Sequence, residues 1–587
     1  MKSYVADFET TTKLPFSYVW AYAISDVSNI DDIIVGTSID EFMEWCEHTC
    51  GNDAIYFHNL KFDSQFIMYW LFKHDFTYIE TKKERKNKTF TATISDKGLY
   101  YTIDVYFKVQ GKRVNKVTFK DSLKLIPLSV DKIAKSLKLP FQKLSIDYDS
   151  HNDIPAGTPL TDEEIAYIKH DVKIVAYALN YFFSQGLDKL TIGACALDEY
   201  KKIIDKKMFE RYFPVLPWDA DIRPSYRGGF TYVNPDYAGK QLKEGIVFDV
   251  NSLYPSVMDS CYLPYKTPIM YKGKYEHDDF YPLYIQILRC QFRLKKGKIP
   301  TIQIKDQPGR FKPTEYLTSS GDEEATLCLT SVDLELFLEH YDVFNMEYIV
   351  GFKFMATVGL FSEYIKKWSD AKIQAKLEKN HGLYLICKLM LNNLYGKYGT
   401  STELRKKIPY LGEDDVIHFD DSDIEKKDGI YVAMASFITA YARDKTIRSS
   451  QRILDNNAKG LSKAQWIYSD TDSMHIVLNG ESIETFIANS GLDIDDTRLG
   501  AWKFESKFTD SKFLRTKCYL EMSTEDIENP NPEYELKVTC AGMPKDCHSQ
   551  VTFKNFKIGA TYKGKKQPKI IPGGVILKEV DFTIKKE

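Results

Sequence analysis

Apolar runs of strand length and segments with helical periodicity both occur along the chain, so we expect both strands and helices. Residues 245–248 predict a strand that ends in a polar turn, whereas 466–468 and 474–478 predict the two arms of a β-hairpin. Residues 331–340 predict a capped helix. A chain of 587 residues is long enough for several domains, each with its own core.

Composition and charge agree with a globular protein that handles nucleic acid. The 39 Tyr and 35 Phe offer flat surfaces for base stacking, although a tyrosine-rich core accounts for most of them. The net charge is only −3, yet residues 554–587 carry nine lysines against three acids, and 82–88 are also basic. The acidic residues gather elsewhere, including 413–428. Basic segments beside acidic sites suit a phosphodiester enzyme, although a charge run is more often a solvated face.

The ten cysteines form no CxxC pair, and Cys46, His48 and Cys50 make only a weak metal pattern. We therefore expect reduced thiols in a cytosolic protein. No segment looks like a signal peptide, a membrane span or an internal repeat, so we expect a soluble intracellular protein.

Two acidic segments, 249–255 and 468–473, indicate a metal-dependent reaction. Asp249 follows the predicted strand, and Asp470 with Asp472 crowds the tip of the predicted hairpin. Such crowding of carboxylates is costly unless a cation neutralises it. Either segment alone could be an ordinary Asp/Ser turn. Together they favour nucleotidyl transfer by two Mg²⁺ ions held roughly 3.5–4 Å apart.

A second set of carboxylates lies in the N-terminal third. Asp7 and Glu9 are two apart in a predicted strand, so they share a face. Asp63 follows another apolar strand, and Tyr167 with Asp171 shares one face of a predicted helix that follows a capping sequence at 161–164. Four carboxylates and a hydroxyl that orients water fit two-metal hydrolysis of a phosphodiester.

Segments 249–255 and 468–473 resemble motifs A and C of family B DNA polymerases. The N-terminal carboxylates resemble the ExoI, ExoII and ExoIII motifs of DEDD 3′-5′ exonucleases. In their combined order, nearly end to end, the chain resembles the protein-primed family B polymerases of small Bacillus phages, the phage phi-29 type. Two elements depart from that pattern, because Asn393 stands where the family has Ser and Ala442 where it has Gly.

The resemblance implies an α/β multidomain fold, with an RNase H-like 3′-5′ exonuclease followed by a right-hand polymerase that has a small basic thumb. Between Pro255 and Lys388 lie 132 residues, whereas two antiparallel finger helices need about 50. The surplus resembles an inserted terminal-protein region, although the sequence alone is equally consistent with an insertion that has no function. The expected parts are the exonuclease 1–192, palm 193–260 and 431–512, terminal-protein regions 261–356 and 399–430, fingers 357–398 and thumb 513–587.

The resemblance also implies roles for the acidic residues. Asp249 and Asp472 would bind both metals, with Asp470 close by and the Val250 carbonyl as a further ligand, while the primer 3′-hydroxyl attacks the α-phosphate of a dNTP. In the exonuclease, the metal ligands would be Asp7, Glu9, Asp63 and Asp171. Tyr167 would orient water, and Lys143 would support catalysis, although by itself it would be read as a surface lysine.

The nucleotide and DNA contacts follow from the same resemblance. Lys388, Asn392 and Tyr395 lie near one helix face at spacings of four and three, and Tyr254 is the expected steric gate. The dNTP would contact Val250, Tyr254, Lys372, Lys388 and Tyr395. The frayed single strand would contact Thr10, His58, Asn59, Phe62, Ser122 and Leu123. The primer-template would contact Tyr226, Arg227, Gly228, Gly229, Ser252, Asn392, Thr439, Arg443, Thr471, Lys517 and Tyr519.

The resemblance implies that this is a DNA polymerase with proofreading, which replicates a phage genome by protein-primed, processive strand displacement. Its cofactor would be Mg²⁺, which Mn²⁺ can replace. Its partners would be primer-template DNA, dNTPs, a terminal protein and phage single-stranded and double-stranded DNA-binding proteins, and it would act as a monomer in the host bacterial cytoplasm. Two alternatives remain: an exonuclease whose polymerase half is only a DNA-binding platform, and a non-enzymatic replication-initiation scaffold. Intact Asp249, Lys388 and Asp472 argue against the first.

Overall fold

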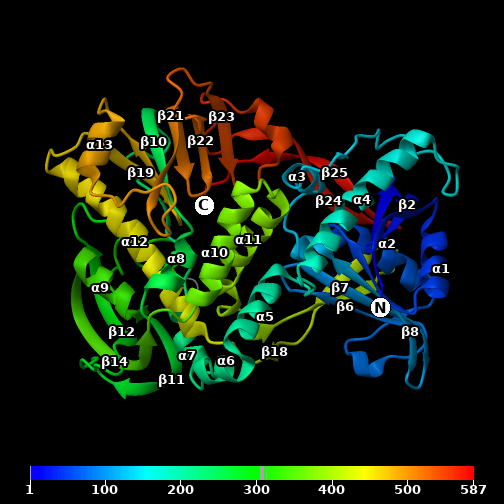
Figure 1. Cartoon of the computed structure of the whole chain (residues 1–587), viewed down its shortest axis with the longest axis horizontal. Helices are drawn as coiled ribbons and strands as arrows, with labels where there is room; N and C mark the ends of the chain where they lie inside the picture. Colours follow the sequence, from blue (N-terminus) through cyan, green and yellow to red (C-terminus); the bar gives the residue numbers. More distant parts are fainter. Residues whose placement is uncertain (1, 305–309, 313, 587) are drawn as a thin grey trace.

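The computed structural model describes residues 2–304, 310–312 and 314–586 (Figure 1). The expected insertion 261–356 and the basic segment 554–587 therefore include a few residues, 305–309, 313 and 587, that lie outside the described part. Within that part, no helix is both long and apolar enough to cross a membrane.

The N-terminal domain is built on an eight-stranded sheet with the order β3-β2-β1-β4-β8-β7-β6-β5. Alternate residues of β1 enter two different cores: Phe8 packs with α1 and α2, whereas Val5 packs in the core that contains α4. Helix α4 begins with the predicted capping box of Thr161 and Glu164. The elements are β1 (Ser3–Thr10), β2 (Val19–Asp26), β3 (Asn29–Gly36), α1 (Ile39–Thr49), β4 (Asn52–Phe57), α2 (Leu60–Lys73), β5 (Thr77–Tyr78), β6 (Thr89–Ile94), β7 (Tyr100–Gln110), β8 (Arg113–Asp121), α3 (Val130–Ser136) and α4 (Asp162–Ser184).

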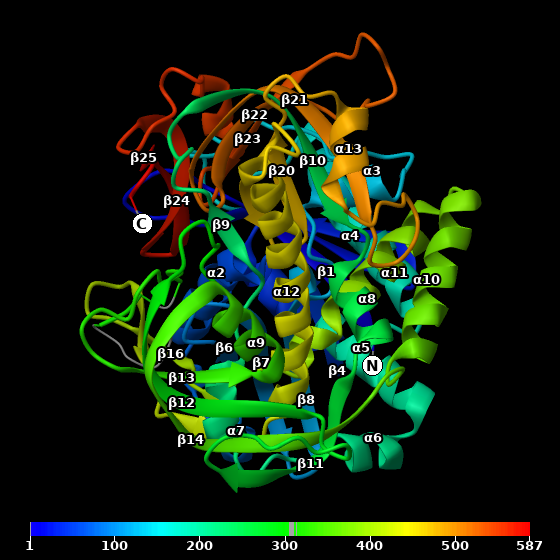
Figure 2. The same ribbon diagram turned by 90° about the vertical axis from the view of Figure 1, so that its left-hand side faces the viewer.

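A seven-stranded sheet with the order β23-β22-β21-β10-β20-β19-β9 forms the centre of the other half. The long helix α12 packs against β19 and α8, as Figure 2 shows. The predicted strand and hairpin are confirmed as β10 and β19–β20. The elements are α5 (Ile192–Ile204), α6 (Lys206–Tyr212), α7 (Asp219–Ile222), β9 (Thr231–Val233), β10 (Gln241–Val250), α8 (Leu253–Ser260), α12 (Val432–Ala458), β19 (Gln465–Asp470), β20 (Ser473–Val477), α13 (Ile483–Ser490), β21 (Trp502–Arg515), β22 (Cys518–Thr524) and β23 (Glu535–Cys540).

The long insertion forms a sheet of its own, with the order β11-β14-β12-β13 and helix α9 against it. The predicted helix at 331–340 is confirmed as α9. Helices α10 and α11 follow as an antiparallel pair. The elements are β11 (Leu263–Lys272), β12 (Leu283–Leu294), β13 (Ala325–Thr330), α9 (Ser331–His340), β14 (Tyr341–Thr357), α10 (Ser362–Leu377) and α11 (His381–Asn393).

The short insertion forms two small hairpins, β15 (Glu403–Leu404) with β18 (Glu425–Lys426) and β16 (Lys407–Leu411) with β17 (Ile417–Asp421). It is docked on the N-terminal domain. The Tyr69 hydroxyl donates to Asp415 Oδ2 over 2.6 Å, and Ile417 is buried in the N-terminal core.

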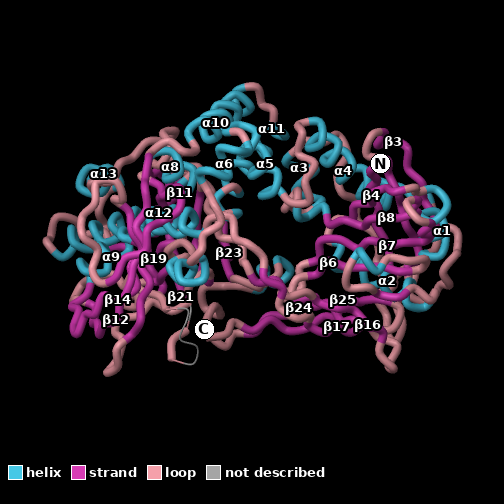
Figure 3. Tube along the Cα trace, turned by 90° about the horizontal axis from the view of Figure 1, so that it is seen from below, coloured by secondary structure: helices cyan, strands magenta, loops and turns pink. Residues whose placement is uncertain are grey.

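The C-terminal hairpin, β24 (Thr561–Ile571) with β25 (Gly574–Thr583), reaches the N-terminal domain with its tip. The Ser17 amide donates to the Pro572 carbonyl over 3.1 Å. Gly573 has φ of 89°, and a Cβ there would lie 1.9 Å from the Ser17 carbonyl oxygen, so only glycine fits this contact. Figure 3 shows β24–β25 and β16–β17 beside each other on this domain, and β25, β16 and β17 all contact α2.

Two sequence-based boundaries differ from the structure. The expected thumb boundary at 513 falls inside β21, and β22 and β23 continue the seven-stranded sheet. Sequence patterns reveal strands but not which sheet they join, because pairing partners lie far apart in the chain. Tyr395 was expected on a helix, but α11 ends at Asn393 and Tyr395 begins a 3-10 turn.

Candidate active sites

The three acidic side chains of the large half meet at the end of one strand pair. Asp249 at the end of β10 is paired in register with Ser473 of β20. The Val250 amide donates to the Asp472 carbonyl over 2.8 Å. Asp249, Asp470 and Asp472 are therefore brought together, as the two motifs predict.

The electrostatics of this site favour a cation. Burial, with the carboxylates of Asp472 and Glu505 nearby, raises the pKa of Asp249 to about 8, and Lys388 acts against that rise. Burial also raises the pKa of Asp472. Glu505 was not predicted; it lies in β21 beside a β-bulge, and its surrounding sequence carries no motif.

Asp470 differs from its two neighbours because protein donors already occupy it. Its Oδ1 accepts from Thr231 Oγ1 at 3.2 Å and pairs with Lys517 Nζ at 3.1 Å. Its Oδ2 accepts from the Tyr468 hydroxyl at 3.1 Å, and that hydroxyl accepts from the Lys517 amide at 3.0 Å. Asp470 therefore holds Lys517 beside the carboxylates of Asp249 and Asp472, the candidate metal ligands.

The residues expected at the nucleotide also converge. The rings of Tyr254 and Tyr395 are stacked, with centroids 4.1 Å apart. Lys388 is exposed on α11 and close enough to influence Asp249. Lys372 on α10 has its ammonium 5.8 Å from the Tyr384 ring centroid, and Asn392 is exposed at the end of α11.

The glycine motif at 226–229 packs directly on the hairpin turn. The Thr471 amide donates to the Phe230 carbonyl over 2.7 Å, and Thr446 Oγ1 donates to the Thr471 carbonyl over 2.7 Å. A Cβ on Gly229 would lie 2.6 Å from Thr471 Cγ2, so the approach requires glycine there. Ser252, the residue that precedes α8, adopts a left-handed backbone conformation with φ of 52°.

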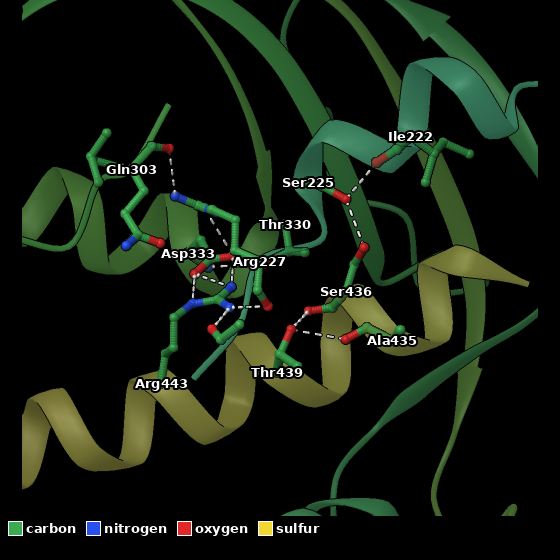
Figure 4. A network of polar contacts seen from close by, with 12 residues as sticks. Ile222, Ser225, Arg227, Gln303, Thr330, Asp333, Ala435, Ser436, Thr439 and Arg443 are labelled. Carbon is green, nitrogen blue, oxygen red and sulfur yellow. Dashed lines mark hydrogen bonds and ion pairs between the residues drawn. The ribbon is translucent and has the colours of Figure 1, made fainter. Parts of the chain in front are cut away.

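Three side chains expected on DNA are instead buried in the network of Figure 4. Arg443 and Arg227 are each 2% exposed and both pair with Asp333 of α9, at 2.8 and 3.4 Å. Arg443 also donates to the carbonyls of Arg227 and Gly228. The Thr439 hydroxyl is buried and donates to backbone carbonyls of α12.

The predicted direct DNA contacts of the Arg227, Thr439 and Arg443 side chains are therefore wrong for this structure. Burying a charge is costly unless it is paired, and here one carboxylate pairs with two guanidinium groups. The network holds the backbone of Gly228 in place, and Gly228 is exposed while Tyr226 and Gly229 are half-buried.

The N-terminal carboxylates line a cavity of about 1110 Å³. Burial and the Asp171 carboxylate raise the pKa of Asp7 to about 7, and burial first of all raises the pKa values of Glu9, Asp63 and Asp171. Lys143 pairs with Asp171. The Tyr167 hydroxyl lies 2.9 Å from that of Tyr148, a neighbour that the sequence did not indicate. The C-terminal hairpin, including Lys566 and Leu577, forms another wall.

Of the residues expected to hold a single strand, four line this cavity: Thr10, His58, Asn59 and Phe62. Ser122 and Leu123 do not line it. The Ser122 hydroxyl is buried and bonds His58 Nδ1 at 2.9 Å and the Phe57 carbonyl at 3.0 Å. The predicted contact of Ser122 with DNA is therefore wrong, and its side chain supports His58 instead.

Both sites have donor sets that suit a hard divalent cation. Carboxylates and a backbone carbonyl are the ligands that Mg²⁺ prefers, and Asp171 Oδ1 is buried with no hydrogen-bond partner in the described part. Among the described residues, no three His, Cys, Asp or Glu side chains already surround one point closely enough to form a metal cluster.

Known proteins with the same sequence pattern and fold identify the family. The family model described as "DNA polymerase type B, organellar and viral" matches residues 49–158 and 153–477. The chain belongs to the type B DNA polymerases. The DNA polymerase of Bacillus phage Nf is 44% identical over 595 residues, with all of both chains covered. The solved phi29 DNA polymerase with primer-template DNA is 42% identical over all of both chains, with a TM-score of 0.91, and the ternary complex with incoming nucleotides gives 0.90.

This membership confirms the predicted fold class and polymerase function. After the parts that the sequence predicts, the seven-stranded sheet is called the palm below, α10 with α11 the fingers, and β24–β25 the thumb. The chain is thus a DNA polymerase of the phi29 type.

Proposed function

We propose that this polymerase couples DNA synthesis at Asp249 and Asp472 to 3′-5′ exonucleolytic proofreading in the N-terminal cavity. The observation that carries the proposal is the presence of two separate groups of carboxylates, half-buried at the palm and mostly buried in the N-terminal domain. Each group contains an acid whose pKa is raised, to about 8 at Asp249 and to about 7 at Asp7. Both groups therefore gain from a bound cation.

At the palm, Asp249, Asp472 and the Val250 carbonyl would hold two Mg²⁺ ions, which Mn²⁺ can replace. Bound there, the ions lower the pKa of the primer 3′-hydroxyl and neutralise charge on the pyrophosphate. Lys388 and Lys372 bind the triphosphate. Tyr254 and Tyr395 form a wall that excludes a ribose 2′-hydroxyl, and Ser252, Thr471 and Asn392 contact the nascent pair and template.

The primer strand is held by Lys517 and Tyr519. Asp470 acts as the partner that orients Lys517, since its oxygens accept from Lys517, Thr231 and Tyr468. Gly228 and Gly229 admit the template backbone beside Tyr226. Arg443, Arg227 and Thr439 act through that backbone and do not touch DNA with their side chains.

In the N-terminal cavity, Asp7, Glu9, Asp63 and Asp171 would hold the metal ions, Tyr167 orients the attacking water, and Lys143 neutralises Asp171. Thr10, His58, Asn59 and Phe62 hold the frayed strand. A contact of Leu123 with that strand stays a prediction from the sequence. The thumb lines this cavity, and we propose that it guides a frayed primer end into it.

We further propose protein-primed replication with strand displacement in the cytoplasm of a bacterial host. The inserted sheet β11–β14 would contact the terminal protein, and the docked short insertion would enclose the template. Phage DNA-binding proteins would act on the strands, and the polymerase works as a monomer. Support comes from full-length relatives that are DNA polymerases of Bacillus phages.

The test combines two reactions. Primer extension with dNTPs and Mg²⁺ separates a polymerase from a nuclease with a DNA-binding platform and from a non-enzymatic scaffold. Incubation with a candidate terminal protein, labelled dATP and Mg²⁺ should yield a protein-nucleotide adduct. Normal extension without any adduct would reject protein priming and leave the polymerase assignment intact.

A further inference from the structure

A buried pair, His475 and Glu521, joins two distant strands of the palm. His475 Nδ1 lies 2.6 Å from Glu521 Oε1, and the two residues are 3% and 1% exposed. His475 is on β20 and Glu521 on β22, and β10 and β21 lie between them in the sheet. In a flat sheet, three strand spacings of about 4.8 Å would separate β20 and β22 by roughly 14 Å. The contact therefore requires a strongly curled sheet.

Aromatic rings fill the inside of this curl. Tyr468, Phe513 and Tyr519 have ring centroids 5.2, 5.4 and 5.2 Å from that of His475. Phe513 and Tyr519 are stacked 5.1 Å apart. Such contacts across strands fix how tightly the sheet curls.

The strands that the pair joins carry different parts of the active site. Strand β20 begins at Ser473, directly after Asp472. On β22, Glu521 follows Tyr519 by two residues, so the side chains of Tyr519 and Glu521 point to the same face of the sheet. From β19, beside β20, the Tyr468 hydroxyl connects Asp470 to the amide of Lys517, which directly precedes β22. The distance from the metal-type carboxylates to the primer-holding residues therefore depends on this curl.

We propose that His475 and Glu521 are a positioning pair that sets the place of the primer terminus relative to Asp249 and Asp472. The pair touches neither primer nor nucleotide. Loosening it lets β22 move away from β20, which displaces Lys517 and Tyr519 while the carboxylates stay on β10 and the hairpin. The proposal rests on the proposed role of Lys517 and Tyr519 at the primer.

The test uses Glu521→Leu and His475→Leu, with Glu521→Gln as the variant that keeps size and hydrogen bonding. Each Leu variant should raise the KM for primer-template about tenfold while kcat at saturating DNA changes less than about threefold. Glu521→Gln should restore KM to within about twofold of the parent. The double Leu variant should be no worse than either single variant, since both remove one interaction.

A second measurement follows the primer end itself. A fluorescent base at the 3′ terminus should report a larger share in the N-terminal cavity for Glu521→Leu and an unchanged share for Glu521→Gln. The matched control is His151→Leu, which breaks another buried pair, His151 with Glu164 at 2.7 Å in the N-terminal domain. It should leave the KM for primer extension unchanged.

Three results would overturn the proposal: a fall in kcat with KM unchanged, additive effects in the double variant, or the same KM rise in the control. If the Leu variants do not fold, Glu521→Ala removes the contact without placing an apolar side chain beside His475, and an unchanged primer distribution in that variant would equally reject the proposal. Lys517→Ala distinguishes a failure of the positioning proposal for His475 and Glu521 from a failure of the proposed role of Lys517 at the primer. Normal primer KM in Lys517→Ala would reject the role of Lys517, whatever the pair does.

Discussion

The rings of Tyr254 and Tyr395 stack with centroids 4.1 Å apart, although 141 positions separate them in the chain. Tyr254 belongs to motif A at the start of α8 and Tyr395 follows α11, so palm and fingers share one aromatic wall. A wall of two rings leaves less space for an extra hydroxyl than a single side chain would.

Sugar selection should therefore depend on Tyr254. Tyr254→Val should raise ribonucleotide incorporation relative to dNTP, because it removes the clash with the 2′-hydroxyl. Tyr254→Phe keeps the ring and serves as the control with an unchanged ratio. Single-turnover kinetics measure the rates of rNTP and dNTP incorporation. If Tyr254→Val has the same rNTP/dNTP ratio as the parent enzyme, the steric gate lies elsewhere.

The two carboxylate sites should be separable by single substitutions. Asp249→Ala or Asp472→Ala should lower extension at least about a thousandfold while 3′-5′ degradation of single strands stays nearly normal. Asp7→Ala or Asp171→Ala should do the reverse. Loss of both activities from one change in a folded variant would contradict the two-site arrangement.

The metal-free protein should become less stable as the pH rises. The raised pKa values, about 8 for Asp249 and about 7 for Asp7, mean that the folded state binds more protons than the unfolded chain above about pH 4. The free energy of unfolding therefore falls as pH rises through those values. In EDTA, Tm should decline between about pH 5 and pH 8.5, and Mg²⁺ should reduce the decline because it binds the deprotonated acids.

Asp249→Asn is the matched control, because it removes the titration with little change of size. Its decline in Tm should be smaller than that of the parent. A Tm that rises with pH in EDTA would contradict the assignment.

The network around Asp333 should be important for stability. Asp333→Asn leaves the guanidinium groups of Arg227 and Arg443 buried without a counter-charge, which should cost about 3–5 kcal/mol of unfolding free energy. Urea unfolding measures this loss. Glu335→Gln, at an exposed position of the same helix, should change it by less than about 0.5 kcal/mol. An Asp333→Asn loss as small as the control's would show that the pairing contributes nothing.

Processivity should depend on the docking of the short insertion. Deleting 403–426 would remove Ile417 and expose the apolar surface of the N-terminal domain that it packs against. A single substitution is therefore the sharper test. Asp415→Ala removes the partner of Tyr69 and Lys73 and should shorten products on primed circles with an enzyme trap, while single-nucleotide addition stays normal. Asp414→Ala, whose partner is His418 within the loop, is the control. Full-length products from Asp415→Ala would contradict a clamping role.

The sequence was most informative where chemistry and local structure coincide. Asp249 ends a strand, Asp472 sits at a hairpin tip, and the capping box of Thr161 and Glu164 begins α4; each depends on residues close in the chain. The order of these motifs then predicted the family.

The sequence was least informative where the partner of a residue lies far away. Arg443 belongs to a segment that resembles a DNA-binding motif, yet it pairs with Asp333 of the long insertion. Only the folded chain shows that the charge of Arg443 is buried. Glu505 lies at a bulge with no motif around it. The place of β22 and β23 in the palm sheet depends on the pairing of β22 with β21 and of β23 with β22. Long-range pairings of this kind leave no periodic signal in one sequence.

The contact between the Ser17 amide and the Pro572 carbonyl has a topological consequence. The palm continues into the thumb, the thumb tip meets the N-terminal domain, and that domain returns through α5 to the palm, so the chain forms a closed circuit. A linear strand has an end that can be threaded through such a circuit, whereas a covalently closed circle has none. If template DNA passes through this circuit, a closed circle can enter only when the contacts between the thumb tip and the N-terminal domain open, so anything that fastens the tip to Ser17 should slow loading on circles far more than on linear strands.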